Sequence, residues 1–265
     1  MNNLLYIYWN VSPTIFQLGP LKAKYYGFFF SSVFVVAYVV MRAIFLKEKI
    51  PLQHLTRLMV YSIIGVVVGT RLAHVCFYEP AYYYAHPVEI FMFWKGGLAS
   101  HGGIIGIIIA AWIFSAKSPP KASFLWTMDR VMIPVAFASV LVRLGNLFNS
   151  EIVGRPTDVP WAFVFPRVDM LPRHPTQLYE ALFYLIIGLI LLVWYYKTDA
   201  RIYKGLFFGI ALVSVTIFRI LIEFFKENQV VFEDKMILNM GQWLSVPFLI
   251  AGVYFVIRAL TRKEL

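Results

Sequence analysis

The chain has few charged residues and almost no cysteine. Only 14% of its 265 residues are Asp, Glu, Lys or Arg, whereas 60% are hydrophobic and 18% are aromatic. A soluble domain usually contains about 25% charged residues, so this composition excludes an ordinary soluble protein and predicts several membrane spans. The single cysteine, Cys76, allows no internal disulfide and no cysteine-based metal site. Its apolar neighbours predict a small buried packing residue.

Sequence signals of several other protein classes are also missing. The 5 histidines form no i, i+4 pair, so we expect no metal site. The glycines after position 101 lack the lysine of a phosphate-binding loop, and no nucleotide cofactor is expected. Lys and Arg are scattered over short loops, which disfavours nucleic-acid binding. The first residues lack a basic segment and a cleavage site, so the first span is expected to serve as the insertion signal.

Apolar runs divide the chain into seven segments, each close to the roughly 20 residues that cross a bilayer. They cover residues 26–46, 58–77, 90–114, 124–147, 178–196, 205–225 and 241–259. The third is rich in glycine, which permits a break or a re-entrant path, and Pro134 predicts a kink in the fourth. We therefore predict an all-α polytopic membrane protein with seven transmembrane helices in one bundle, a single domain over residues 1–265.

Lys and Arg are concentrated in alternate connections. The loops after the first, third and fifth spans and the C-terminal tail carry more of them than the other loops, which hold most loop acids and also Lys226. Because Lys and Arg favour the cytoplasmic side, we expect the N-terminus outside and the C-terminus in the cytoplasm. The connection over residues 148–177 then lies outside, and its prolines and aromatic residues predict a folded extracytoplasmic cap.

Charged and amide side chains interrupt the apolar segments. An Arg or Asp at the centre of a spanning helix costs roughly 2.5–3.5 kcal/mol on insertion scales, so such groups usually have a function. These groups predict a polar chamber within the membrane. The main candidates are His101, Arg143, Asn146, Asn149, Glu151, Arg219 and Glu223.

The spacing of Arg143, Asn146 and Asn149 predicts that they share one face if the fourth helix continues. A guanidinium group suits a phosphate because it offers two parallel donors. The alternative is an arginine that pairs with Glu151 or Asp129 and only holds helices together. Two buried arginines on different helices repel each other unless an anion lies between them, which favours a phosphate for Arg143 and Arg219.

The glycine-rich stretch around His101 has two interpretations. A histidine can act as a base near neutral pH, and neighbouring glycines let a substrate approach closely. Alternatively, His101 hydrogen-bonds between helices, and Gly102 and Gly106 form a small-residue packing pair.

Three further positions also have structural alternatives. Arg219 and Glu223 have the spacing of a simple intrahelical ion pair. Tyr26 at the start of the first span suits an interfacial anchor. Arg71 either contributes to an anion site or anchors the second helix, and the sequence favours neither.

Several motifs in order along the chain resemble one known family, the prolipoprotein diacylglyceryl transferases. The match runs through nearly the whole chain and is most specific over residues 143–154. In two departures, Phe148 and Ser150 stand where the family more commonly has isoleucine and glycine. The matching stretches are Leu18–Gly19–Pro20 with Tyr25–Tyr26–Gly27, Gly69–Thr70–Arg71–Leu72, residues 96–103, residues 143–157, residues 161–163, residues 173–180, Arg219 with Glu223–Phe224, and Met240–Gly241–Gln242.

The resemblance implies a bacterial inner-membrane enzyme that needs no cofactor or metal. Such an enzyme moves a diacylglyceryl group from phosphatidylglycerol to the lipobox cysteine thiol of a preprolipoprotein, and it releases glycerol 1-phosphate. Its partners are phosphatidylglycerol, the signal peptide that carries the lipobox cysteine, and membrane lipids. The implied functional positions are Tyr26, His101, Arg143, Asn146, Glu151, Gly154, Arg219 and Glu223.

A mechanism built from the residues agrees with that reaction. Arg143 and Arg219 would hold the phosphate and stabilise charge on the departing oxygen. A thiol with a pKa near 8.5 costs only about 2 kcal/mol to deprotonate at pH 7, so His101 suffices as the base, with Glu151 as the alternative. Glu151 could instead orient the histidine or the incoming peptide, and Tyr26, Asn146 and Asn149 could donate hydrogen bonds to the headgroup. Glu223 is a further catalytic candidate, and Gly102, Gly103 and Gly154 would contact the substrate.

Three rival functions use the same polar groups. An anion transporter would also have buried arginines and broken helices, although the two halves of the chain show no repeat. Another lipid enzyme, such as an acyltransferase or phosphatase, would release different products. A lipid-binding assembly protein would leave phosphatidylglycerol intact.

Overall fold

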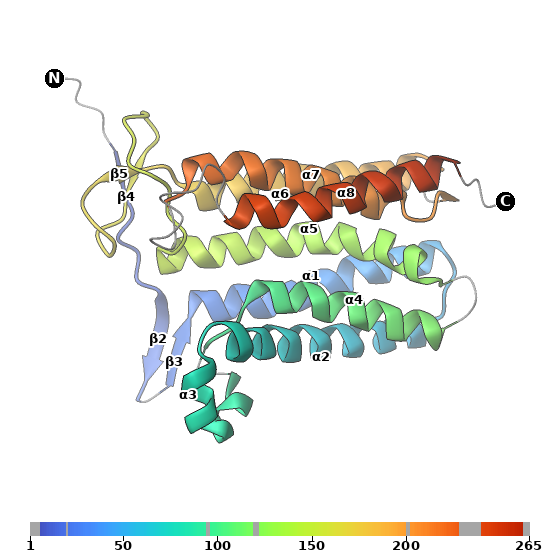
Figure 1. Ribbon diagram of the computed structural model, residues 1–265, viewed down its shortest axis with the longest axis horizontal. Coiled ribbons are helices and arrows are strands. Elements are labelled where there is room, and N and C mark those ends of the chain that lie inside the picture. The colour runs from blue at the N-terminus through green and yellow to red at the C-terminus, as the bar shows by residue number, and fades with distance from the viewer. Residues whose placement is uncertain are drawn as a thin grey trace. The chain divides into compact units, whose positions relative to one another are not determined.

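The computed structural model is mainly helical and describes residues 6–19, 21–93, 96–118, 122–199, 202–227 and 240–261 (Figure 1). Six helices are long and apolar enough to cross a membrane, which confirms a polytopic, mostly helical membrane protein. The long helices are α1 (Tyr25–Lys47), α2 (Leu52–Phe77), α5 (Phe124–Asn149), α6 (Thr176–Lys197), α7 (Leu206–Ile222) with the 3-10 turn η4 (Glu223–Phe225), and α8 (Met240–Thr261). The shorter ones are α3 (Pro80–Ala85), η1 (Pro87–Phe91) and α4 (Ser100–Ala116).

The third apolar segment differs from its expected bounds. Its helix, α4, begins at Ser100, ten residues after the predicted start at position 90. Gly96 and Gly97 precede it with φ angles of 98° and 70°, which glycine adopts without strain but which interrupt a helix. α4 has 17 residues and, at a rise of 1.5 Å per residue, is about 25 Å long. It is therefore shorter than the roughly 30 Å hydrocarbon core of a bilayer.

The chain divides into two compact units, residues 38–131 and residues 1–37 with 132–265. Within the first of these, α2 and α4 pack with their backbones in close contact. A Cβ atom on Gly102 would overlap the carbonyl oxygen of Gly69, and one on Gly106 would overlap that of Gly65. The small-residue packing expected for Gly102 and Gly106 is confirmed.

The other unit contains short strands that an all-α prediction did not include. β1 (Ile7–Tyr8) pairs in parallel with β4 (Phe163–Val164), and β4 pairs antiparallel with β5 (Pro172–Arg173). Leu147, Phe163 and Phe165 form a small core here, with Trp9 packed against it. A second pair, β2 (Thr14–Leu18) and β3 (Leu21–Lys24), forms a hairpin. The segment over residues 148–177 is folded, as expected, but the N-terminal strand completes its sheet.

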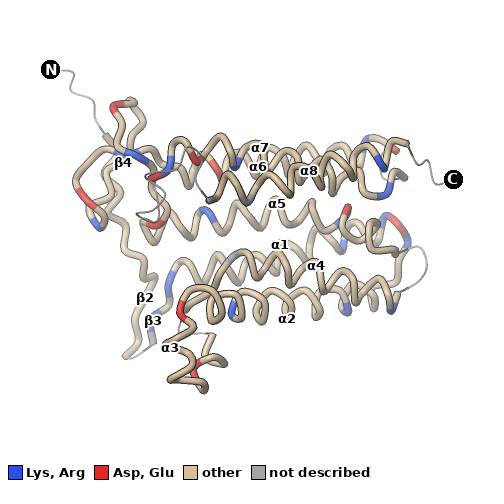
Figure 2. Tube along the Cα trace, in the orientation of Figure 1, with Lys and Arg blue, Asp and Glu red and all other residues tan. Residues whose placement is uncertain are grey.

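The long helices expose apolar side chains along their middles. Val39 on α1, Ile64 on α2 and Ile250 on α8 are each more than half exposed, which suits contact with lipid. Lysine, arginine, aspartate and glutamate gather mainly toward the helix ends and in the loops (Figure 2). Cys76 is exposed on α2, so the prediction of a buried cysteine was wrong. The loop charges counted at residues 233–235 and 262–263 lie outside the described residues.

Candidate functional site

Arg143, Asn146 and Asn149 lie on one face of α5, as their spacing predicts. α5 continues as one helix through Pro134 to Asn149. Arg143 Nη1 donates to Asn146 Oδ1 at 3.3 Å, and the Asn146 amide donates to Glu151 Oε2 at 3.3 Å. The Asn149 amide donates to Glu151 Oε1 at 3.1 Å. The predicted set from the end of the fourth span therefore forms one hydrogen-bonded group.

The ion-pair partner of Arg143 is Glu180 on α6. Arg143 Nη2 lies 2.6 Å from Glu180 Oε2, and the two side chains are 14% and 1% exposed. The partner is therefore neither Glu151 nor Asp129, the two acids considered from the sequence. The signal was present, because Glu180 is the one charged residue in the predicted span over residues 178–196.

Lys226 is buried, although it was counted among the outer-loop charges. Its Nζ lies 2.8 Å from Glu180 Oε1 and 3.3 Å from Glu223 Oε1, and its side chain is 4% exposed. Lys226 directly follows η4, which turns the chain back toward α6 at this point. A lysine this deep is stable only with paired carboxylates, so its place could not be inferred from loop counting.

Arg219 and Glu223 form the intrahelical pair that their spacing allows. Arg219 Nη2 lies 3.6 Å from Glu223 Oε1, and the side chains are 35% and 10% exposed. The contacts therefore run from Arg143 through Glu180, Lys226 and Glu223 to Arg219. We call these five residues the charged network. As far as the described residues show, it holds three cations and two carboxylates.

Tyr26 lies at the start of α1 and packs beside this part of α5. A Cβ atom on Gly145 would lie 3.0 Å from Tyr26 Cδ2, so the glycine leaves room for the ring. Tyr26 also lies within electrostatic range of Glu151 and Arg143. The structure thus brings Tyr26 to the Arg143–Glu151 group, beyond the anchor role that its position alone suggests.

The turn after α5 has an unusual backbone. Ser150 and Ile152, on either side of Glu151, have φ angles of 55° and 57°, in the left-handed region that favours glycine. A glycine at position 150 would adopt this conformation without strain. Arg167 Nη2 donates to Ser150 Oγ at 2.8 Å and so supports the serine in this conformation.

Gly154 lies where two other segments approach its backbone. A Cβ atom there would lie 2.6 Å from the His174 Cβ atom and 2.8 Å from the Phe225 carbonyl oxygen. Arg173 Nη1 donates to the Gly154 carbonyl at 3.0 Å. Close backbone packing therefore requires a glycine at this position, whatever its contact with substrate.

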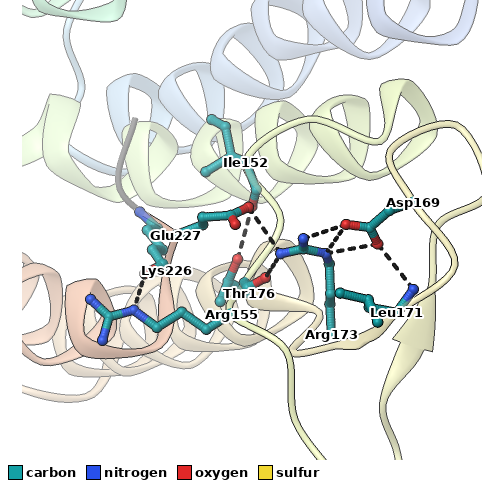
Figure 3. Close-up of polar contacts among 9 residues, drawn as sticks. Ile152, Arg155, Asp169, Leu171, Arg173, Thr176, Lys226 and Glu227 are labelled. Atoms are coloured by element: carbon teal, nitrogen blue, oxygen red, sulfur yellow. Dashed lines mark hydrogen bonds and ion pairs between the residues drawn. The ribbon is translucent and has the colours of Figure 1, made fainter. Parts of the chain in front are cut away.

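Arg173 connects this segment to its surroundings. Its guanidinium lies between Asp169 and Glu227, and Arg155 donates to the Lys226 carbonyl at 2.8 Å (Figure 3). The hydrogen bond from Arg173 lowers the pKa of the Asp169 carboxyl below its usual value. Burial lowers the pKa of the His174 imidazole. These contacts hold the backbone of Lys226 while its ammonium group enters the charged network.

His101, Gly102 and Gly103 belong to the unit of residues 38–131. His101 is the second residue of α4 and is exposed, whereas Gly102 packs against α2 as described above. A Cβ atom on Gly103 would lie 3.0 Å from Thr70 Cγ2. The two glycines therefore have a packing role, which is the structural alternative to substrate contact.

Arg71 anchors the irregular segment before α4. Its guanidinium donates to the backbone carbonyls of Ile90, Gly96 and Gly97 at 2.7 to 3.2 Å, and to that of Glu89. It also lies 4.8 Å from the centre of the Tyr83 ring. Of the two interpretations, these contacts favour the anchor.

The fold and the charged network together define the class of protein to which the chain belongs. The chain is a polytopic membrane protein in which a buried network of charges adjoins a strained acidic turn. No group of three or more His, Cys, Asp or Glu residues suited to a metal ion occurs among the residues that the structure describes.

Comparison with known proteins agrees with the motifs. The model of the family described as prolipoprotein diacylglyceryl transferase matches residues 13–258. A protein of Chloroherpeton thalassium is 46% identical over 100% of this chain and 98% of its own length. One of Tolumonas auensis is 45% identical over 97% and 98%, and one of Bacteroides fragilis is 42% identical over 96% of each. All three are named phosphatidylglycerol–prolipoprotein diacylglyceryl transferase. The chain belongs to the prolipoprotein diacylglyceryl transferase family.

Proposed function

We propose that the charged network is the phosphate site of the family's reaction. The protein transfers the diacylglyceryl group of phosphatidylglycerol to a cysteine thiol of a prolipoprotein. A carbon–sulfur bond forms, the bond between the glyceryl carbon and the phosphate oxygen breaks, and glycerol 1-phosphate leaves with both of its bonding electrons. The thiol proton passes to a base. The site must therefore stabilise an anion and accept a proton.

The observation that carries the proposal is the excess of positive charge. Three cations form direct ion pairs with two carboxylates in the described network, and the Glu151 carboxylate reaches Arg143 only through the Asn146 amide. The central members, Glu180 and Lys226, are almost fully buried. A net charge in a poorly solvated site is costly unless a counter-ion neutralises it. The phosphodiester of phosphatidylglycerol carries one negative charge and meets this requirement.

Within the network, Arg219 is the accessible end. Its side chain is 35% exposed, compared with 14% for Arg143. We assign Arg219 the first contact with the headgroup phosphate and Arg143 the charge that grows on the leaving oxygen, where a preorganised donor contributes most. Glu180 and Lys226 hold Arg143 in place.

The base and the peptide contacts follow from the other residues. His101 is exposed and is followed by two glycines, which suits a base that a thiol must reach. Glu151 is exposed as well, and both of its carboxylate oxygens accept amide hydrogens, from Asn146 and Asn149. We assign Glu151 to orienting the incoming peptide or its thiol. Tyr26 contributes a hydroxyl within electrostatic range of Arg143 and Glu151. Gly154 keeps the adjoining backbone close.

The membrane arrangement is also part of the proposal. Six long helices and the shorter α4 would give seven crossings in one membrane domain, with residues 148–177 as a cap. An odd number of crossings places the termini on opposite sides, and the lysine and arginine distribution favours the N-terminus outside the bacterial inner membrane. A reporter fused after Leu265 should be active in the cytoplasm, and an extracytoplasmic reporter would overturn this orientation.

The test uses the purified full-length protein in detergent with phosphatidylglycerol and a lipobox peptide. Wild type should form lipidated peptide and an equal amount of glycerol 1-phosphate. Arg219→Gln and Arg143→Lys should lose most of this activity, whereas Arg57→Gln, at an exposed arginine outside the network, should keep it. Bound but intact phosphatidylglycerol would indicate a binding protein, and release of fatty acid or inorganic phosphate another lipid enzyme. Ion flux in vesicles without transfer would indicate a transporter.

A further inference from the structure

Glu151 lies in the middle of a turn that its own sequence disfavours. The φ angles of Ser150 and Ile152 are 55° and 57°. Left-handed backbone is uncommon for residues other than glycine, and a β-branched residue such as isoleucine is the least suited to it. Such conformations persist only where the surrounding structure holds them. The turn therefore requires contacts that prevent it from relaxing.

Two side chains from the first turn of α6 supply those contacts. Gln177 Nε2 donates to the Glu151 carbonyl at 2.7 Å. Thr176 Oγ1 donates to the Ile152 carbonyl at 2.8 Å (Figure 3). Both side chains are fully buried. The Glu151 N–H group donates to the Asn146 carbonyl at 2.9 Å, so the peptide groups on both sides of the Glu151 Cα atom are held.

Within the described part of the chain, the Gln177 side-chain amide makes one hydrogen bond, which it donates to the Glu151 carbonyl. Its Oε1 atom is buried and has no hydrogen-bond partner there. A buried polar atom without a partner is unfavourable, and methionine would fill the same space without that cost. Glutamine therefore provides a hydrogen-bond donor to the turn that methionine would lack.

We propose that Gln177 and Thr176 are positioning residues that hold the strained turn in place. They keep the Glu151 carboxylate in reach of the Asn146 and Asn149 amides, and so direct it toward the reacting peptide. If the turn relaxed, the carboxylate would leave both amides. The expected effect on turnover rests on the proposed function. The two hydrogen bonds from Gln177 and Thr176 to the turn, which we call the clamp, do not depend on that function.

The first experiment removes the clamp and then the strain. Gln177→Met should lower kcat about ten- to a hundredfold, because a displacement of about 1 Å at a reacting group has effects of that size. KM for phosphatidylglycerol should change less than about twofold, because the charged network is intact. Adding Ile152→Gly, which makes the left-handed conformation free of strain, should restore most of kcat. Adding Lys49→Gly, at another left-handed residue with φ 58° in the other unit, should restore nothing.

A second experiment reads the clamp without reference to activity. Hydrogen exchange of the Glu151 amide, which is hydrogen-bonded in wild type, should become faster in Gln177→Met and in Thr176→Val and recover when Ile152→Gly is added. Unchanged exchange in both single variants would overturn the clamp. Faster exchange with normal kcat would overturn the positioning role. If the variants show the expected exchange pattern but the wild type transfers no diacylglyceryl group, the proposed function is refuted and the clamp is supported.

Discussion

Glu180 Oε2 lies 2.6 Å from Arg143 Nη2, so this pair links α6 to α5, and the Glu180 side chain is buried. The second oxygen of the same carboxylate lies 2.8 Å from Lys226 Nζ. One acid on α6 thus joins two cations from different segments, and it is the residue through which most of the charged network is connected.

Replacing Glu180 by glutamine should destabilise the protein and abolish transfer. Loss of one partner of a buried ion pair typically costs about 3–5 kcal/mol, because the remaining charge is left without compensation. Here two cations would be affected. Thermal unfolding in detergent should show a clear decrease in Tm. Asp158→Asn, at an exposed acid in the segment over residues 148–177, should change stability by less than about 0.5 kcal/mol. Equal Tm values for the two variants would contradict the central place of Glu180.

Lys226→Met should weaken phosphatidylglycerol binding without unfolding the protein. In this variant the ion pairs of Glu180 with Arg143 and of Glu223 with Arg219 remain, so both carboxylates still have a partner. The network loses one positive charge, which at roughly 8–12 Å and an effective dielectric constant near 20 is about 1–2 kcal/mol toward a bound anion. KM for phosphatidylglycerol should therefore rise about five- to thirtyfold. Lys226→Arg should restore it, and an unchanged KM in Lys226→Met would remove the lysine from the phosphate site.

The Arg173–Asp169 pair should make the segment over residues 148–177 sensitive to acid. The folded state lowers the pKa of Asp169, so this pair stabilises the fold above the unfolded pKa of about 3.9. That stability is lost as pH falls through the lower folded value. At neutral pH, Asp169→Asn should be cleaved faster by protease within this segment than wild type. The difference should shrink as the pH falls below about 4, whereas a difference that stays constant as the pH falls would argue against this linkage.

Gly102→Ala should prevent normal packing of α2 against α4. The added methyl group would overlap the Gly69 carbonyl oxygen, and backbone atoms cannot move aside as a flexible side chain can. We expect poor folding of residues 38–131, measured as lower yield and lower Tm. Gly27→Ala is the matched control, since nothing lies within 4 Å of a Cβ atom there. An alanine in this helix should be neutral or stabilise by about 0.5–1 kcal/mol. Normal folding of Gly102→Ala would contradict the close approach.

The hydrophobic pattern predicted most helices well because lipid leaves the backbone few choices. A chain in hydrocarbon must satisfy its own hydrogen bonds, so an apolar run of about 20 residues becomes a helix. The predicted span over residues 124–147 corresponds to Phe124–Asn149, and that over residues 178–196 to Thr176–Lys197. The same rule failed for the segment over residues 90–114, where glycine conformations and the contacts of Arg71 delay the helix to Ser100.

The candidate site was predictable where its residues are neighbours in sequence. Helical spacing placed Arg143, Asn146 and Asn149 on one face, and it paired Arg219 with Glu223. Glu180 could have been selected from its charge within an apolar span. Its partners could not, because an ion pair between α5 and α6 depends on how the helices pack.

By itself, the sequence determined that this is a multi-span membrane protein of the diacylglyceryl transferase family, since apolar runs and ordered motifs are properties of the chain. Only the tertiary structure decided that Lys226 is buried, that Ile7–Tyr8 completes a sheet with Phe163–Val164, and that Gln177 holds the turn at Glu151. Each of these joins residues distant in sequence. Such contacts form only when helices and loops have packed, and their energies depend on burial and distance that composition and spacing do not specify.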